Sequence, residues 1–289
     1  MASTQGLKLR IRSVKNTKQI TKAMQLVAAS KMRRAQEATK ASAPYTQAAS
    51  EILASLSAHT ASDNHPLYTV RQVKSRLIVL IASDKGLAGA YNTNVLKIYT
   101  GELQADAKNG IKTETLTIGR KASHFATRIK DTNIIGVYEG LPDQPDGGSL
   151  LPMFQMVQDK FVSGEVDAVD LIYTEFISSL NQKPKMVRIL PAGITTDPEV
   201  KSAIRDATYE PSASRVLDEV TSRLINAQVF QALLDARASE HSMRMLAMKN
   251  ATDNASDLAD DLTLAMNKAR QGAITQELAE ISGGAEAMK

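Results

Sequence analysis

Residues 212–271 of this 289-residue chain read "SASRVLDEVTSRLINAQVFQALLDARASEHSMRMLAMKNATDNASDLADDLTLAMNKARQ" and contain neither glycine nor proline. Helix is the only regular structure that would use so long an uninterrupted stretch, since the mean helix has only ~11 to 12 residues. At ~1.5 Å per residue this helix would be roughly 90 Å long. It would exceed the diameter of a domain of this size, so it is expected to project.

Apolar residues recur along this helix with a heptad spacing. Alternate steps of four and three residues reach sixteen positions, of which thirteen are apolar, whereas the overall composition of 43% hydrophobic residues would give about seven. The positions are Val220, Leu224, Ala227, Gln231, Leu234, Ala238, His241, Met245, Met248, Thr252, Ala255, Ala259, Leu262, Met266, Ala269 and Ala273. A period of 3.5 residues held over this length predicts a left-handed coiled coil.

The N-terminal residues are predicted to form the helix that pairs with this C-terminal helix. A weaker apolar stripe of the same period comprises Leu7, Ile11, Val14, Thr21, Ala28, Met32 and Ala35. Pro44 is expected to kink or interrupt this helix, because proline removes a backbone hydrogen bond at a cost of ~3 kcal/mol. The helical pattern then resumes in "TQAASEILASLSA" (46–58).

The middle of the chain is richer in glycine than its two ends. Eleven of the fifteen glycines lie between Gly86 and Gly193. Strands are expected at 76–83, 113–119, 132–138, 166–176 and 185–192, with helices at 90–108, 120–130 and 150–164. The last two strands could pair as a hairpin across residues 177–184. Strands that alternate with helices predict an open, Rossmann-like α/β sheet.

The expected fold class is therefore α/β, with a long two-helix coiled coil into which a Rossmann-like domain is inserted. We expect three segments: an N-terminal coiled-coil helix at 1–65 with its kink near Pro44, the α/β domain at 66–210, and a C-terminal coiled-coil helix at 211–289.

Charge is distributed unevenly along the chain. Residues 1–40 hold ten cations against one acid, whereas residues 41–289 hold 25 cations and 30 acids. A basic arm on an otherwise acidic protein suggests an acidic partner: nucleic acid, anionic lipid or an acidic protein surface. There is no cysteine, and no apolar run approaches the ~20 residues needed to span a bilayer. We read the chain as lacking a secretory signal, so any membrane link would be peripheral.

Three motifs could carry chemistry. "SDKGLAGAYNTN" (83–94) follows a strand and precedes a helix, yet it matches neither dinucleotide-binding nor Walker A patterns, so a tight turn is favoured, with Asp84 as a turn cap and Lys85 at the surface. The four histidines lack metal-ligand spacing. Four acidic residues could together hold a cation: Asp253, Asp257, Asp260 and Asp261. We favour the alternative that they form a solvated face of the helix that pairs with the basic helix. We expect no catalytic residue, no metal site and no cofactor.

Nucleic-acid binding through the basic helix is an open alternative, because Lys and Arg would supply the phosphate contacts. However, no aromatic residue precedes Tyr45 to stack on bases, and the cations surround the helix instead of lining one face. A basic coiled-coil nucleic-acid-binding or scaffold protein is the second hypothesis, and an enzyme that uses the α/β domain is a distant third.

The ends of the chain resemble a known family. "ITKAMQLVAASKMRRAQ" (20–36), "SDKGLAGAYNTN" (83–94), "ASEHSMRMLAMKNATDNASDL" (238–258) and "NKARQGAITQELAEISGGA" (267–285) are similar to the γ subunits of F-type ATP synthases, of the bacterial type. The resemblance implies a non-catalytic rotor shaft, the central stalk. Its end helices would form an antiparallel coiled coil inside a hexamer of α and β subunits, and its α/β domain would contact the ε subunit and the membrane c-ring. Proton flow would be coupled to ATP synthesis or hydrolysis on the β subunits.

The resemblance also implies roles for individual residues. Arg270 and Gln271 match the family's contact with a catalytic-subunit loop, and Thr275 and Glu277 lie in the adjacent coupling segment. Met24 and Arg244 match positions near the acidic lever loop of the β subunit. Six cations of the basic helix would face acidic partner loops: Lys15, Lys18, Lys22, Lys31, Arg33 and Arg34.

Two departures from the family pattern have physical consequences. Gly272 stands where the family usually has alanine, a change that costs ~1 kcal/mol of helix stability. Ala88 stands where the family usually has cysteine, and no thiol-based regulation is expected. The resemblance places the chain at the cytoplasmic face of a bacterial inner membrane, or at the matrix face in a mitochondrion, without nucleic acid as a partner.

Overall fold

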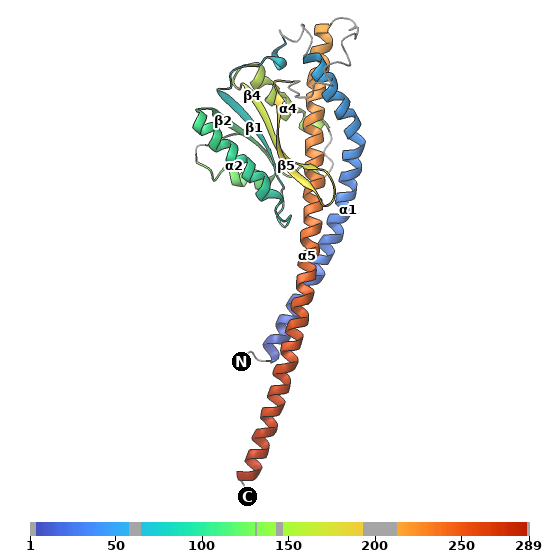
Figure 1. Cartoon of the computed structure of the whole chain (residues 1–289), viewed down its shortest axis with the longest axis vertical. Helices are drawn as coiled ribbons and strands as arrows, with labels where there is room; N and C mark the ends of the chain where they lie inside the picture. The colour runs from blue at the N-terminus through green and yellow to red at the C-terminus, as the bar shows by residue number, and fades with distance from the viewer. Residues whose placement is uncertain (1–3, 58–64, 131, 143–146, 193–212, 288–289) are drawn as a thin grey trace. The chain divides into compact units, whose positions relative to one another are not determined.

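The computed structural model describes residues 4–57, 65–130, 132–142, 147–192 and 213–287. It contains two compact units. The two-helix unit comprises residues 1–28 and 244–289, and the α/β unit comprises residues 29–243. Two helices, α1 (Thr4–Ser57) and α5 (Ala213–Ala287), run through both units (Figure 1). The expected boundary between residues 210 and 211 lies outside the described residues.

Helix α1 continues through Pro44, so the interruption that was one of the two expectations there does not occur, and the kink stays a prediction. Contacts on both sides of Pro44 hold the backbone helical. The Ser42 hydroxyl donates to the side-chain oxygen of Gln231 on α5, and the Thr46 hydroxyl donates to the Ser42 carbonyl at 3.2 Å. Ala49 is buried in the core of the α/β unit. Tertiary packing therefore outweighs the hydrogen bond that proline removes.

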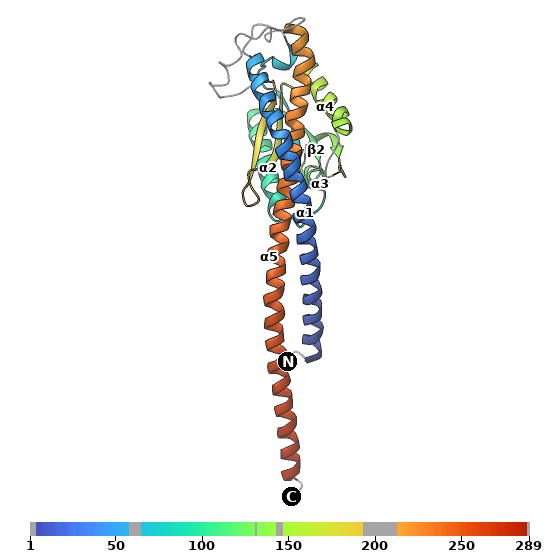
Figure 2. The ribbon, with the colours of Figure 1, turned by 90° about the vertical axis from the view of Figure 1, so that its right-hand side faces the viewer.

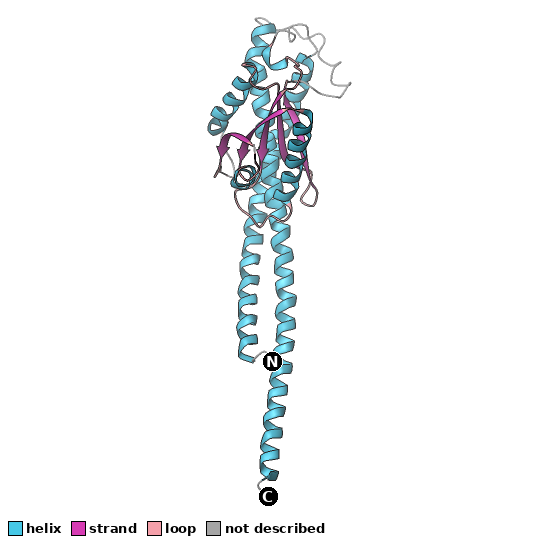
Figure 3. Cartoon of the chain, turned by 90° about the vertical axis from the view of Figure 1, so that its left-hand side faces the viewer, coloured by secondary structure: helices cyan, strands magenta, loops and turns pink. Residues whose placement is uncertain are grey.

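The α/β unit is built on a five-stranded sheet with the order β3-β2-β1-β4-β5, drawn in magenta in Figure 3. The strands are β1 (Ser75–Ile81), β2 (Lys112–Ile118), β3 (Asn133–Tyr138), β4 (Ala168–Phe176) and β5 (Gln182–Leu190). The first four are parallel, and β5 pairs antiparallel with β4. All five expected strands and the closing hairpin are confirmed.

Helices cover both faces of this sheet, which explains the unbroken apolar run of β1. Leu77, Val79 and Ile81 belong to the core cluster that includes α4 (Gly147–Val162) and α5, together with the short 3-10 helix η2 (Pro66–Tyr68). Ile78 and Leu80 belong to the cluster on the opposite face, with α2 (Tyr91–Asn109) and α3 (Arg120–Ala126). Parallel strands buried on two faces need apolar residues at every position. The predicted Rossmann-like α/β class is therefore confirmed.

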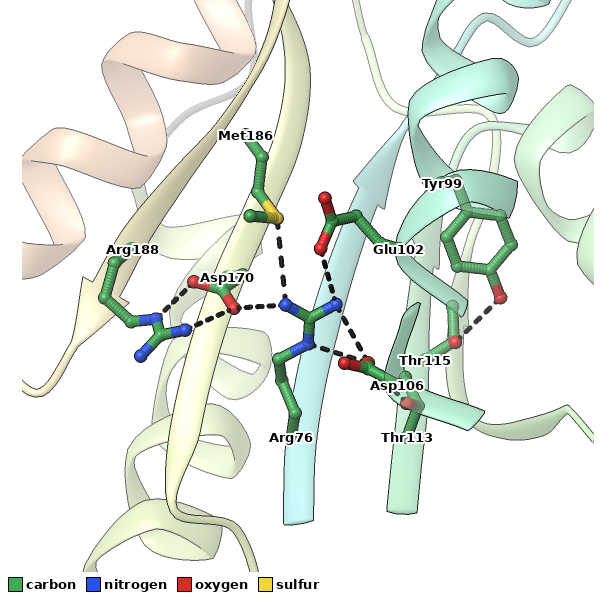
Figure 4. A network of polar contacts seen from close by, with 9 residues as sticks. All are labelled: Arg76, Tyr99, Glu102, Asp106, Thr113, Thr115, Asp170, Met186 and Arg188. Carbon is green, nitrogen blue, oxygen red and sulfur yellow. Dashed lines mark hydrogen bonds and ion pairs between the residues drawn. The ribbon is translucent and has the colours of Figure 1, made fainter. Parts of the chain in front are cut away.

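A buried ionic network lies where β1 and β4 begin (Figure 4). The Arg76 guanidinium contacts Glu102 at 2.9 Å, Asp106 at 2.9 Å and Asp170 at 3.3 Å. Arg188 of β5 binds Asp170 from the other side. Because these carboxylates come from α2 and β4, one arginine of β1 connects three elements of the unit.

The loop after β1 is a tight turn, as expected, but Asp84 has a different role. Helix α2 starts after Ala90 without a side-chain cap. The Asp84 carboxylate instead accepts hydrogen bonds from the backbone N–H groups of Arg120 and Gly140, both at 3.1 Å. The expectation of a local cap was wrong because the groups that Asp84 binds follow β2 and β3, far along the sequence. Lys85 is exposed, as expected.

Candidate functional site: the two-helix unit

Helices α1 and α5 lie side by side and antiparallel in the two-helix unit (Figures 1 and 2). The hydroxyl oxygens of Thr21 and Thr252 share a hydrogen bond at 2.8 Å. The ammonium group of Lys18 donates to the hydroxyl of Ser256 at 2.8 Å. Residues nearer the N-terminus of α1 thus face residues nearer the C-terminus of α5, as an antiparallel pair requires.

The seam between the two helices is narrow, and half of its buried apolar residues are alanines. Its buried apolar residues are Leu7, Ile11, Ala28, Met248, Ala255 and Ala259. Small side chains allow the helix backbones to approach closely. They bury little apolar surface, so each contact adds little stability. Polar contacts in the seam involve hydroxyl groups.

The predicted heptad is confirmed as far as Ala269, which is half-buried, but it is wrong at Ala273, which is exposed. The register of the helix pair explains this difference. Lys18 lies opposite Ser256, so Thr4, the first residue of α1, lies opposite a residue near 270. Beyond that point α5 has no facing helix among the described residues (Figure 2).

Residues 270–283 form a single exposed helix, here called the terminal segment. Ile274, Leu278 and Ile281 are 49%, 62% and 70% exposed. Their spacing of four and three residues places them on one face of the helix. A contiguous exposed apolar stripe of this kind is typical of a helix that docks against a partner protein.

The four sequence-predicted residues of the terminal segment flank this apolar stripe. With ~3.6 residues per turn, Arg270 and Glu277 lie along one side of the stripe, and Gln271 and Thr275 lie along the other. All four are exposed, and the Thr275 hydroxyl donates to the Gln271 carbonyl at 3.0 Å. The geometry therefore combines an apolar centre with charged and polar margins, the usual anatomy of a protein interface.

Met24 and Arg244 are both half-buried in the two-helix unit. Taking the Thr21–Thr252 pair as the reference, Met24 lies about 4.5 Å further along the axis and Arg244 about 12 Å further in the same direction. The axial separation of roughly 7.5 Å is within reach of two long side chains. The structure therefore places the two positions in the same part of the helix pair.

The cations of the basic helix differ in their surroundings. Lys15, Lys22, Arg33 and Arg34 are exposed, whereas Lys18 and Lys31 are half-buried. The Lys22 ammonium reaches only the amide oxygen of Gln25, at 3.3 Å, on its own helix. Much of the positive charge of α1 therefore faces outward.

The acidic set on α5 is solvated, as expected, but its pairing with the basic helix is not observed. Asp253, Asp257, Asp260 and Asp261 are all exposed, and none takes part in the ion pairs found among the described residues. They lie on the side of α5 opposite the seam. The buried residues Thr252, Ala255 and Ala259 lie on the seam side. No group of three or more potential ligands in the described part of the chain could hold a metal ion.

Sequence reasoning missed the apolar stripe of the terminal segment. A signal was present, since Ile274, Leu278 and Ile281 repeat the heptad spacing two residues out of phase with the seam. Exposed apolar residues also occur elsewhere on the two-helix unit: Leu9, Ile20, Leu26, Val27, Leu258 and Leu264. None of the helices in the described residues is long and apolar enough to cross a membrane.

Comparisons of the sequence with known proteins agree along the whole chain. A family model described as ATP synthase matches residues 3–288. The ATP synthase gamma chain of Stenotrophomonas maltophilia (strain R551-3) is 42% identical over 289 residues, covering 100% of both chains. The ATP synthase gamma chain of Pelotomaculum thermopropionicum is 41% identical over 291 residues, again covering 100% of both.

Solved structures give the same result for the fold. A chain from the central stalk and c-ring structure of the Tetrahymena thermophila mitochondrial ATP synthase matches 80% of this chain and 99% of its own length, with a TM-score of 0.61 and 25% identity. A chain from the Euglena gracilis mitochondrial ATP synthase matches 99% of this chain and 94% of its own length, with a TM-score of 0.70 and 18% identity. The relatives do not support a nucleic-acid-binding or scaffold protein, and the chain belongs to the ATP synthase γ chain family.

Proposed function

We propose that this chain is the central rotor shaft of a proton-translocating F-type ATP synthase. In this role it couples proton flow through the membrane sector to ATP synthesis or hydrolysis on the β subunits, and it is not itself catalytic. The family membership supports the role. The terminal segment is the structural observation that carries it, because it faces no other helix in the described part of the chain and its apolar stripe needs a partner protein.

A hexamer of α and β subunits is the partner that the two-helix unit fits. The unit is a narrow antiparallel pair with apolar and cationic residues facing outward. An exposed ion pair is worth only ~0 to 1 kcal/mol, so lysines and arginines can bind and release acidic loops as the shaft turns. We assign this role to six cations of α1, three in the two-helix unit and three just beyond it: Lys15, Lys18 and Lys22, and Lys31, Arg33 and Arg34.

Contacts that transmit torque to the β subunits are assigned to two groups of residues. Arg270, Gln271, Thr275 and Glu277 would bind a catalytic-subunit loop from the margins of the apolar stripe. Met24 and Arg244 would lie against the acidic lever loop, because they occupy the same part of the helix pair.

The α/β unit would connect the shaft to the remaining partners, the ε subunit and the membrane c-ring. The complex would hold the chain peripherally, at the cytoplasmic face of a bacterial inner membrane. The bacterial gamma chains among its relatives support this location.

Reconstitution with α and β subunits tests the proposal. The purified chain should enter the complex once per hexamer, and the complex should then hydrolyse ATP faster than the α and β subunits alone. Native mass spectrometry measures the stoichiometry. A chain that remains separate, or that enters in several copies, would contradict the proposal.

A further inference from the structure

A short part of α5 is bound to β4, to the turn between β4 and β5, and to the start of β5. The Ser239 hydroxyl donates to the Thr174 carbonyl of β4 at 3.2 Å. The Ser242 hydroxyl donates to the Ser179 carbonyl in the β4–β5 turn at 2.6 Å, and the Gln182 side-chain amide donates to the Ser242 oxygen at 3.2 Å. These contacts lie within the last residues of α5 that belong to this unit.

Arg237 makes the charged contacts of this segment. Its side chain is only 7% exposed. One terminal nitrogen contacts Glu240 of the same helix at 3.2 Å. The other contacts the Asp84 carboxylate at 3.4 Å and donates to the Leu141 carbonyl at 3.1 Å. The guanidinium therefore reaches from α5 to the loops that follow β1 and β3.

Asp84 extends this connection to a third loop. One of its oxygens accepts the N–H groups of Arg120, at the start of α3, and of Gly140, after β3. The other oxygen faces Arg237. Since β3, β2 and β1 are neighbours in the sheet, Asp84 connects the ends of three adjacent strands, and Arg237 connects that group to α5.

Both members of this ion pair are held in their charged forms. Burial alone would raise the pKa of Asp84, but the N–H groups of Gly140 and Arg120, together with Arg237, lower it below its ordinary value. Burial alone would lower the pKa of Arg237, but the charges around it, with Glu240 the strongest and Asp84 among them, keep it above its ordinary value. The pair therefore persists at neutral pH.

The position of the pair in the fold is informative. In open α/β sheets, ligands bind outside the carboxyl ends of the strands. Here this edge is occupied by groups of the chain itself, because Arg237 supplies a cation and Asp84 supplies an anion. A place that could hold a ligand instead fastens a helix.

The other buried residues of α5 in this region are mainly apolar. Leu233, Leu234, Ala236 and Ala238 are all buried. Apolar burial holds the helix against the sheet, but it is non-directional. Charge-assisted hydrogen bonds are directional and roughly twice as strong as neutral ones, so Arg237 adds a contact that opposes sliding or rotation of the helix.

We propose that Arg237 is a positioning residue that fastens α5 to the sheet inside the α/β unit through Asp84, and that torque transfer between the sheet and α5 depends on it. The torque part rests on the rotor function proposed above. The fastening part concerns this chain alone.

Hydrogen exchange of the full-length chain tests the fastening. In Arg237→Met, Asp84 loses its cationic partner, so the amides of Arg120 and Gly140 should exchange at least about tenfold faster, because hydrogen bonds to charged groups are among the stronger ones that hold such a loop. The amide of Leu80, inside β1, should be unchanged. Arg223→Met removes an exposed arginine from the same helix and should alter neither loop amide. Unchanged exchange at Arg120 and Gly140 in Arg237→Met would overturn the proposal.

Proton pumping by the reconstituted complex tests the torque transfer. The complex with Arg237→Met should hydrolyse ATP at the wild-type rate without load. It should sustain no more than about half of the wild-type proton gradient, because α5 can then move against the sheet under load. Arg237→Lys should sustain most of the wild-type gradient. The control Arg223→Met should sustain the full gradient. Asp84→Asn should resemble Arg237→Met, with the double variant no worse than either.

The outcomes separate this proposal from the function on which it rests. If the wild-type complex does not pump, the rotor function fails, and the exchange measurement still decides the fastening. If the wild-type complex pumps and Arg237→Met sustains the full gradient, the torque part is overturned while the rotor function stands. If Arg237→Met does not fold, Arg237→Lys and Asp84→Asn decide both parts through the same two measurements.

Discussion

The two-helix unit and the α/β unit use charged residues in opposite ways. In the α/β unit, Arg76 and Arg237 are buried and held by carboxylates. In the two-helix unit, the seam polar contacts are made through hydroxyl groups, and most of the cations face outward. The difference indicates a division of labour. One unit keeps its strong interactions inside and holds its own shape, whereas the other leaves its charges and apolar stripe available for partners.

Removal of Arg76 should have the largest effect on stability. Arg76→Met would leave three carboxylates without their shared cation in a buried site, so we expect a loss of ~3 to 5 kcal/mol in the free energy of unfolding. Urea denaturation followed by circular dichroism measures it. Arg128→Met removes an exposed arginine from the same unit and should change stability by no more than ~0.5 kcal/mol. Equal effects of the two variants would contradict the assignment of the network as the charged core of the domain.

Asp235 should make the stability of the α/β unit depend on pH. Its pKa is raised to about 7, chiefly by burial and also by the charge of Glu175, against the lowering effects of the hydrogen bond from Gln231 and the charge of Lys185. The folded state therefore holds a proton that the unfolded state releases above pH ~4. Stability should fall as pH rises from about 4 to about 7, by up to ~1.4 kcal/mol per pH unit, and level off above that range.

The Asp235→Asn variant isolates this contribution. Asparagine cannot ionise, so the variant should lose this part of the pH dependence and exceed the wild type in stability at pH 8. Urea denaturation of both proteins from pH 5 to pH 8 provides the comparison. Parallel stability curves for the two proteins would show that Asp235 does not titrate in this range.

A charge on the apolar stripe should affect the complex and not the chain alone. Leu278 is 62% exposed, so Leu278→Asp should change the free energy of unfolding by no more than ~0.5 kcal/mol. Binding to the α and β subunits should weaken by about tenfold or more, as for a central interface residue. Ala279→Asp places the same charge off the stripe and should weaken binding less. The reverse order, measured by titration calorimetry, would exclude the stripe as the docking face.

A new cation at Met24 should impair coupling to a smaller extent. Met24→Lys adds a positive charge beside the proposed acidic lever loop, so the protons pumped per ATP hydrolysed should fall a few-fold, about the effect of one exposed ion pair. Ala23→Lys adds a cation on the adjacent exposed position and serves as the control. A ratio that stays at the wild-type value in Met24→Lys would remove this residue from the coupling contacts.

The smallest effect is expected at Gly272. Its backbone is helical, and an added Cβ would meet no atom within 4 Å. Gly272→Ala should therefore stabilise the terminal segment by ~1 kcal/mol without altering the unfolding of the α/β unit. Slower hydrogen exchange confined to residues near 272 is the expected result. Faster exchange there would contradict the helical assignment of the segment.

Sequence periodicity predicted the elements well, because each depends on nearby residues. The apolar run of β1 and the heptad of α5 are local patterns of this kind. The Arg76 network and the Asp84 contacts were not predicted, since Asp170 and Arg237 lie far along the chain from their partners. An interruption at Pro44 was one of two expectations from propensity, and it was wrong because packing against α5 and the core maintained the helix, whereas the kink expected there stays a prediction.

The candidate site was predicted in part. The seam positions followed from the heptad, but the end of the pairing at residue 270 depends on where α1 begins and on the register of the two helices. The lengths expected for the two helices already differed, which was a signal that part of α5 would lack a partner. The apolar stripe itself could have been found from its shifted phase.

A hydrogen-exchange footprint of the chain, alone and in complex with α and β subunits, tests the division of labour most directly. The account predicts that the terminal segment and residues 4–28 of α1 become protected in the complex, while the amides of α2 exchange as they do in the free chain. Protection of α2, with the terminal segment unchanged, would contradict the assignment of the two-helix unit as the part that the hexamer surrounds.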